Sequence, residues 1–176
     1  MEIKENKNIK ILRSEEYNYI FNKQTGFFVR WGKTKDDDPE YSKYGPEILD
    51  LEISSGSCMK ECSFCYKENG GNESYHMTFE EFKNILDKMP KTLTQIAFGL
   101  TNTFSNPDFI RILEYCRDNE VIPNLTTHGL DITEKNAKIL AKYCGAVAVS
   151  YSANKEKIYQ SINNLYNAGM RQINIH

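Results

Sequence analysis

The sequence predicts an α/β protein built on a parallel sheet that curves into a barrel, or into an open part of one. From residue 48 onward, strand patterns and amphipathic helix patterns alternate, which is typical of βα units with right-handed crossovers. In each predicted strand, apolar residues alternate with small or polar ones, whereas fully buried parallel strands are nearly continuous apolar runs. We therefore expect one face to pack on helices and the other to line a ligand cavity.

The first 45 residues are expected to form a short N-terminal extension. Two aromatic runs, residues 17–21 and 27–31, flank a turn that ends at Gly26, and this arrangement predicts a β-hairpin. The acidic run before Pro39 is expected to be a solvated loop. The chain is therefore divided into an extension, residues 1–45, and a core domain, residues 46–176.

Five strands and four helices are predicted in the core domain. Helix starts carry typical capping residues, such as the capping box from Thr78 to Glu81, Pro107 in a first turn and Thr133 as a hydroxyl cap. The predicted strands are residues 48–54, 94–100, 122–127, 146–152 and 172–176, and the predicted helices are residues 79–89, 109–119, 134–144 and 155–168.

The carboxyl ends of parallel strands are where such folds place their sites. Polar or sulfur-containing residues lie at or just after each predicted strand end. They are Cys58, Thr101, His128, Ser152 and His176. The sequence thus predicts a site at this edge of the sheet.

Three cysteines, Cys58, Cys62 and Cys65, follow the first core strand with the spacing Cys-x3-Cys-x2-Cys. Three thiolates in one loop can hold a metal centre and leave one coordination position open for a ligand. This arrangement favours a catalytic centre over a closed structural one.

A structural zinc site is the alternative, with His76, Cys116 or Cys144 as the fourth ligand. Zinc loops usually repeat a cysteine pair at a distance, and the sequence has no second pair. Cys116 and Cys144 lie in the apolar stripes of amphipathic helices, which predicts core packing for both.

The cysteine spacing, with the aromatic Phe64 just before the third cysteine, resembles the cluster loop of the radical S-adenosylmethionine (radical SAM) enzymes. The resemblance implies a partial (β/α)6 barrel that is truncated here after its fifth strand, so the core domain is expected to be incomplete at its C-terminus. It implies two cofactors, a [4Fe-4S] cluster on Cys58, Cys62 and Cys65, and S-adenosylmethionine on the fourth iron.

Further cofactor-binding residues follow from the same resemblance. Where the superfamily often has Gly-Gly-Glu after the second strand, this chain has Gly99-Leu100-Thr101-Asn102, so Thr101 or Asn102 would be a neutral acceptor for the methionine amino group. His128 replaces the asparagine of a common Thr-Asn-Gly; it would bind the cofactor carboxylate, move a proton, contact substrate, or only pack beside a turn. No catalytic side chain is assigned, and the expected cofactor-binding set is Phe64, Tyr66, Gly99, Thr101, Asn102, Thr126, His128, Ser150 and Ser152.

The resemblance implies an enzyme that reductively cleaves S-adenosylmethionine to a 5′-deoxyadenosyl radical, which abstracts hydrogen from an unknown substrate. That substrate would be a small molecule or, as the Phe-Cys-Tyr run suggests, a peptide or protein. An electron donor such as flavodoxin or ferredoxin is expected. The alternative is a non-catalytic zinc or iron–sulfur module that keeps the fold, favoured by the missing Gly-Gly-Glu carboxylate.

Composition agrees with a compact domain of 176 residues, with 40% hydrophobic and 26% charged residues. A formal net charge of -2 gives no electrostatic argument for nucleic-acid binding. From the first residues no signal peptide is expected, and no apolar run has the length of a membrane span. Five cysteines, three of them in one loop, suit a reducing compartment, so a cytoplasmic protein is expected.

Overall fold

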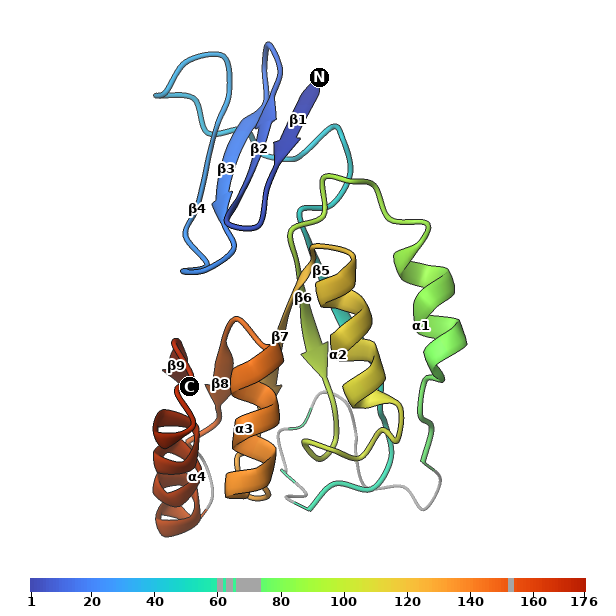
Figure 1. Cartoon of the computed structure of the whole chain (residues 1–176), viewed down its shortest axis with the longest axis vertical. Coiled ribbons are helices and arrows are strands. Elements are labelled where there is room, and N and C mark those ends of the chain that lie inside the picture. Colours follow the sequence, from blue (N-terminus) through green and yellow to red (C-terminus); the bar gives the residue numbers. More distant parts are fainter. Residues whose placement is uncertain (60–61, 63–64, 66–73, 152–153) are drawn as a thin grey trace.

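The computed structural model describes residues 1–59, 62, 65, 74–151 and 154–176, and this part of the chain forms two sheets (Figure 1). The first sheet is antiparallel, in the order β1 (Glu2–Glu5), β2 (Ile9–Arg13), β3 (Asn18–Asn22) and β4 (Phe28–Trp31). The second is parallel, in the order β5 (Ile48–Glu52), β6 (Gln95–Gly99), β7 (Ile122–Thr127), β8 (Val147–Val149) and β9 (Ile173–Ile175). Helices α1 (Phe79–Leu86), α2 (Phe109–Asp118), α3 (Glu134–Tyr143) and α4 (Lys155–Asn167) connect the successive parallel strands.

All five predicted core strands and all four predicted helices are present, and most end one to three residues inside the predicted limits. The α/β prediction of a parallel, partly closed barrel is therefore confirmed. Helix α1 begins as expected: the Thr78 hydroxyl accepts from the Glu81 amide, and the Glu81 carboxylate accepts from the Thr78 amide. The longest described helix, α4, has 13 residues, and none of the described helices could cross a bilayer.

The predicted N-terminal hairpin is present as β3 and β4, and the structure adds β1 and β2 to it. In β2, Ile9 and Ile11 alternate with Lys10 and Leu12, and the buried face is the one that holds Lys10. Lys10 is only 3% exposed, and its ammonium group donates to the Leu93 carbonyl at 2.8 Å and lies 3.1 Å from Glu5 Oε1.

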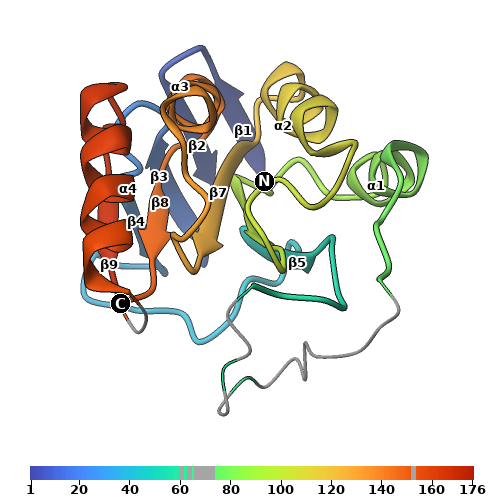
Figure 2. The ribbon, with the colours of Figure 1, turned by 90° about the horizontal axis from the view of Figure 1, so that it is seen from below.

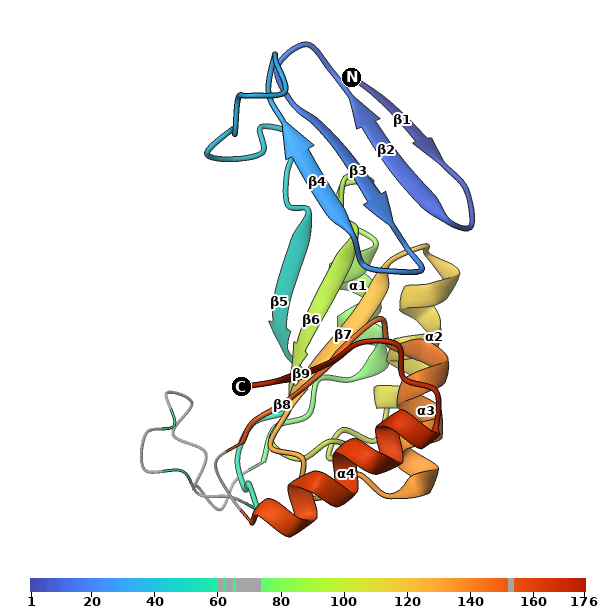
Figure 3. The same cartoon turned by 90° about the vertical axis from the view of Figure 1, so that its left-hand side faces the viewer.

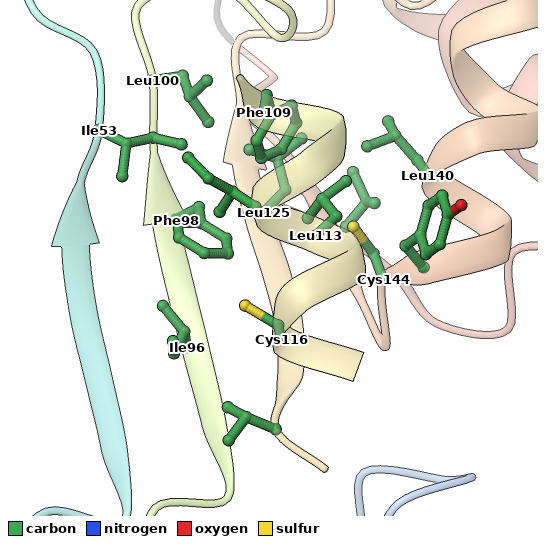
Figure 4. Close-up of a cluster of buried hydrophobic side chains, with 14 of the residues drawn as sticks. Ile53, Ile96, Phe98, Leu100, Phe109, Leu113, Cys116, Leu125, Leu140 and Cys144 are labelled. Atoms are coloured by element: carbon green, nitrogen blue, oxygen red, sulfur yellow. The ribbon is translucent and has the colours of Figure 1, made fainter. Parts of the chain in front are cut away.

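The helices lie along one face of the parallel sheet (Figure 2). Ile96 and Phe98 of β6 point toward α2, where they meet Phe109 and Leu113 in a core that excludes water (Figure 4). Cys116 belongs to this core and is fully buried. The strand alternation therefore places the apolar residues on the helix-covered face, as predicted.

The opposite face of the sheet is concave and lines a cavity of about 350 Å³. Most of its lining from the strands is small or neutral and polar, as expected for this face, but two apolar residues of β7, Ile122 and Leu125, also line it. The small or polar strand residues are Gln95, Ala97, Asn124, Thr126, Ala148 and Asn174.

The antiparallel sheet lies at the amino ends of the parallel strands (Figure 3). The Tyr19 hydroxyl donates to the Thr92 carbonyl at 2.9 Å, just before β6. Ile122, the first residue of β7, packs with Leu12 and Phe21 of the small sheet. The carboxyl ends of the parallel strands are left at the other end of the molecule, and the candidate site is found there.

Candidate functional site

The loops that follow β5 and β6 meet at the carboxyl edge of the sheet. The amide of Ile53 donates to the carbonyl of Gly99 at 3.0 Å, so the chain after β5 continues beside the end of β6. Asn106, which is 2% exposed, donates through Nδ2 to the carbonyls of Ile53 and Met77, both at 2.8 Å. The sequence does not reveal this role of Asn106, because its two partners lie 53 and 29 residues away.

Cys58 lies at this edge, where its Sγ donates to the Thr101 carbonyl at 3.3 Å. The Cys65 amide donates to the Cys62 carbonyl at 3.0 Å. All three cysteines are partly exposed and unpaired. Within the described residues, no three His, Cys, Asp or Glu side chains are gathered closely enough to hold a metal ion.

The donor chemistry of this loop fits an iron–sulfur cluster, because three accessible thiols in one loop are the ligands that such clusters take. The fourth ligands considered for zinc are engaged elsewhere. His76 Nδ1 lies 2.6 Å from Ser54 Oγ, and Cys116 and Cys144 are 0% and 5% exposed in the core. Burial raises the pKa of Cys144 to about 12 and also raises the pKa of Cys116, which disfavours the thiolate that a metal needs.

Asn102 and His128, both predicted to bind cofactor, are in contact with each other. His128 Nε2 lies 3.1 Å from Asn102 Oδ1, and the residue is 8% exposed. The Leu130 amide donates to His128 Nδ1 at 3.0 Å. Both ring nitrogens therefore have hydrogen-bond partners within the protein, as expected for the packing alternative.

The other described residues of the predicted cofactor-binding set lie at the carboxyl edge of the sheet, but in different surroundings. They are Gly99, Thr101, Thr126 and Ser150. Thr101 is 2% exposed and its hydroxyl donates to Ser105 Oγ at 3.1 Å, so only its carbonyl faces Cys58. Thr126 pairs with Gly99 in the sheet and lines the concave cavity, whereas the Ser150 amide donates to Thr127. The remaining predicted cofactor residues, Phe64, Tyr66 and Ser152, lie outside the described residues.

A second polar network joins the loops after β6 and β7, and the sequence did not suggest it. The Thr103 amide donates to Asp131 Oδ2 at 2.7 Å, and the Thr103 hydroxyl also bonds the Asp131 carboxylate. Thr103 Oγ1 lies 2.9 Å from Thr127 Oγ1, which in turn accepts from the Gly129 amide at 3.1 Å. These bonds hold the two loops together independently of Asn102 and His128.

His176, predicted at the mouth of the site, lines the concave cavity together with Asn174. Its amide donates to the Val149 carbonyl at 3.0 Å, which continues the pairing between β8 and β9. The structure thus brings Cys58, Thr101 and His128 to one edge and places His176 on the adjoining concave face.

Comparison with known proteins gives one family and several similar folds. A model of the Radical SAM superfamily matches residues 53–174. SuiB of Streptococcus suis, bound to precursor peptide SuiA, has 12% identity and a TM-score of 0.71 over 99% of this chain and 56% of that chain. No curated protein sequence matches the chain.

Two further solved structures have the same fold over a smaller part of this chain. Native anSMEcpe with bound AdoMet has 20% identity and a TM-score of 0.59 over 74% of this chain and 43% of that chain. BtrN in complex with AdoMet and 2-DOIA has 14% identity and a TM-score of 0.58 over 74% and 56%. The chain therefore spans between 43% and 56% of the length of these three structures.

Proposed function

The chain belongs to the radical SAM superfamily, and on that basis we propose that Cys58, Cys62 and Cys65 hold a [4Fe-4S] cluster at which S-adenosylmethionine is reductively cleaved. Held by these three thiolates, the cluster would supply the one electron that reductive cleavage of S-adenosylmethionine needs, for hydrogen abstraction from substrate. The observation that carries the proposal is the place of Cys58, which lies at the carboxyl edge of the parallel sheet with its thiol against the Thr101 carbonyl.

The residues around this edge would position the cofactor rather than react with it. Thr126 projects into the concave cavity from the end of β7, where its hydroxyl is available to a ligand. Ser150 lies at the end of β8, and Gly99 at the end of β6. In this proposal the concave face orients S-adenosylmethionine and substrate and limits the access of water.

For the substrate, we propose a peptide. SuiB bound to precursor peptide SuiA is similar in structure over 99% of this chain, small sheet included, and an anSMEcpe structure has bound AdoMet and the Cp18Cys peptide. The concave face carries the carboxamides of Gln95, Asn124 and Asn174. Asn124 Nδ2 donates to Gln95 Oε1 at 2.9 Å and Asn124 Oδ1 accepts from the Ala146 amide at 2.9 Å, so in this proposal the Gln95 NH₂ group and the Asn174 carboxamide would bond to the peptide. BtrN with bound 2-DOIA supports a small molecule as the second candidate.

The proposal includes a reductant such as flavodoxin or ferredoxin and a cytoplasmic, reducing environment, since the cluster must accept an electron and its thiolates must stay reduced.

A non-catalytic module that keeps the fold is the second candidate function. One observation favours it: the chain has no carboxylate in the segment Gly99-Leu100-Thr101-Asn102, and Asn102 Oδ1 already faces two hydrogen-bond donors. An ammonium group would then depend on backbone carbonyls at this edge.

Anaerobic reconstitution with iron and sulfide separates the two candidates. We expect the wild type to bind about four irons and, with dithionite and S-adenosylmethionine, to release 5′-deoxyadenosine measured by mass spectrometry. Zinc in place of iron, or no 5′-deoxyadenosine, would contradict the enzyme.

Variants at two cysteines test the ligand assignment. Cys62→Ala should abolish cluster assembly, because three thiolates are the least that hold the cluster. Cys116→Ala is the matched control, since Cys116 is fully buried in the core and should leave the iron content unchanged. Normal iron in Cys62→Ala would refute the assignment of that ligand.

A further inference from the structure

One side chain holds the backbone on both sides of Cys58. Asn102 Oδ1 accepts from the Met59 amide at 3.0 Å, and Asn102 Nδ2 donates to the Ser57 carbonyl at 3.4 Å. The carboxamide therefore bonds to the chain as a neighbouring strand would, with one acceptor and one donor. Cys58 lies between these two bonds, and its thiol meets the carbonyl of Thr101, the residue before Asn102.

His128 determines which way the Asn102 amide faces. Because the Leu130 amide donates to His128 Nδ1, the neutral ring carries its proton on Nε2. Nε2–H then donates to Asn102 Oδ1, so that oxygen accepts from both Met59 and His128. A flipped amide would place its NH₂ against two donors, which makes the flipped state unfavourable.

The contact between Asn102 and His128 is not needed to join the loops after β6 and β7. The Asp131 carboxylate already bonds the Thr103 amide and hydroxyl across the same gap. Loss of the His128 donor should therefore act on the orientation of Asn102, and through it on Ser57 and Met59, with the surrounding loops kept in place.

We infer that Asn102 and His128 are positioning residues that present Cys58 in one orientation. In this role His128 does not bind the cofactor carboxylate or move a proton; it acts on Cys58 through Asn102. The purpose of the arrangement, a preset first ligand for the cluster, rests on the proposed function. The hydrogen bonds of the arrangement join protein atoms only, so it can be tested in the apo protein.

Three variants separate orientation from packing. Gln at position 128 can place an NH₂ group near the position of Nε2 and keep the bond to Asn102, whereas Asn can place an oxygen near Nδ1 and keep only the bond from Leu130. His128→Gln and His128→Asn are thus a matched pair that differ in the bond that matters. Asn102→Ala removes both bonds to the Cys58 segment.

The measurement is the rate at which iodoacetamide alkylates each cysteine of the apo protein, followed by mass spectrometry. Trypsin cleaves after Lys43, Lys60 and Lys67, so Cys58 lies in one peptide and Cys62 and Cys65 in the next. Cys116 and Cys144, 0% and 5% exposed, report whether each variant is folded.

We expect Cys58 to react about 3- to 10-fold faster in His128→Asn and Asn102→Ala, because one or two hydrogen bonds that oppose local opening are lost. His128→Gln should stay within about 2-fold of the wild type, and the peptide with Cys62 and Cys65 should not change. Equal Cys58 rates in wild type and His128→Asn, or equal rates in the two His128 variants, would overturn the inference. If Cys116 becomes reactive in His128→Asn, that variant is not folded. The Cys58 rate in Asn102→Ala is then compared with that in the wild type, and equal rates would overturn the inference.

A second measurement on the same proteins keeps the proposed function separate. After reconstitution, His128→Asn should lose iron to a chelator about 10-fold faster than the wild type, whereas His128→Gln should not. A wild type that takes up no iron would contradict the cluster, while the alkylation rates of the apo proteins would still decide the positioning role.

Discussion

Glu47, the residue before β5, carries a carboxyl group that is buried without a full set of partners. Its side chain is 10% exposed, and in the described part of the chain its Oε1 has no hydrogen-bond partner. Arg30 Nη1 lies 3.7 Å from Glu47 Oε2, and the Nε of the same guanidinium group also lies close to Asp38. Burial raises the pKa of Glu47 from its ordinary 4.5 to about 7, because the carboxylate loses its hydration.

The raised pKa of Glu47 predicts a pH-dependent stability. Between pH 4.5 and about 7 the folded chain keeps a proton that the unfolded chain releases, so the contribution of this group to the free energy of unfolding falls as the pH rises. In thermal denaturation, Glu47→Gln should therefore melt higher than the wild type at about pH 8, and the difference should shrink toward about pH 5. The exposed Glu40→Gln is the control, and a Glu47→Gln difference that does not vary with pH would contradict the prediction.

At the scale of elements, two glycines with left-handed backbone follow β7 and α4. Gly129 has φ +70°, and a Cβ there would lie 2.4 Å from Cγ1 of Val149, a fully buried residue of β8. Gly169 has φ +84° and nothing within 4 Å of the same position. At Gly129, a larger residue is therefore disfavoured both by the backbone conformation and by contact with β8. At Gly169 it is disfavoured by the backbone conformation alone.

The matched pair Gly129→Ala and Gly169→Ala separates these two effects. We expect Gly169→Ala to lower the free energy of unfolding by about 1 kcal/mol through backbone strain. Gly129→Ala should lower the free energy of unfolding by about 1–3 kcal/mol more than Gly169→Ala does, because the added methyl group overpacks the contact with Val149. Urea denaturation measures both, and equal losses would show that the turn moves freely away from β8.

Element types and faces were predictable from the sequence because they depend on local periodicity, as in Ile96 and Phe98 of β6. The cysteine triplet was predictable for the same reason, since its spacing is local. Strands β1 and β2 were not predictable, because the burial of Lys10 in β2 depends on its hydrogen bond to the Leu93 carbonyl, 83 residues away. The pairing of Asn102 with His128 depends on a contact across 26 residues, which neither residue reveals on its own.

At the scale of the whole molecule, the two sheets are joined by buried polar contacts as well as by packing. Tyr19 is fully buried, and its hydroxyl donates to the Thr92 carbonyl of the α/β unit. Tyr17 is 1% exposed in the same apolar cluster, but its hydroxyl has no partner among the described residues. The two tyrosines thus bury the same group with and without a hydrogen bond.

Replacement by phenylalanine should therefore affect the free energy of unfolding differently at the two positions. Tyr19→Phe should destabilise the protein by about 1–1.5 kcal/mol or slightly more, because it leaves the Thr92 carbonyl buried and unpaired. Tyr17→Phe should be neutral or stabilising, because it removes a hydroxyl that burial penalises. Chemical denaturation compares them, and a Tyr17→Phe loss as large as that of Tyr19→Phe would contradict this account.

Strand β7 connects the two ends of the molecule mechanically. Its first residue, Ile122, is embedded in the apolar cluster of the small sheet, and the residue after its last, His128, orients the amide beside Cys58. Six residues of paired strand form a stiff rod about 20 Å long. If the small sheet slides against the α/β unit, either Ile122 leaves its apolar cluster or the ring of His128 moves, and with it the Asn102 amide beside Cys58. The two ends of the molecule are therefore mechanically coupled.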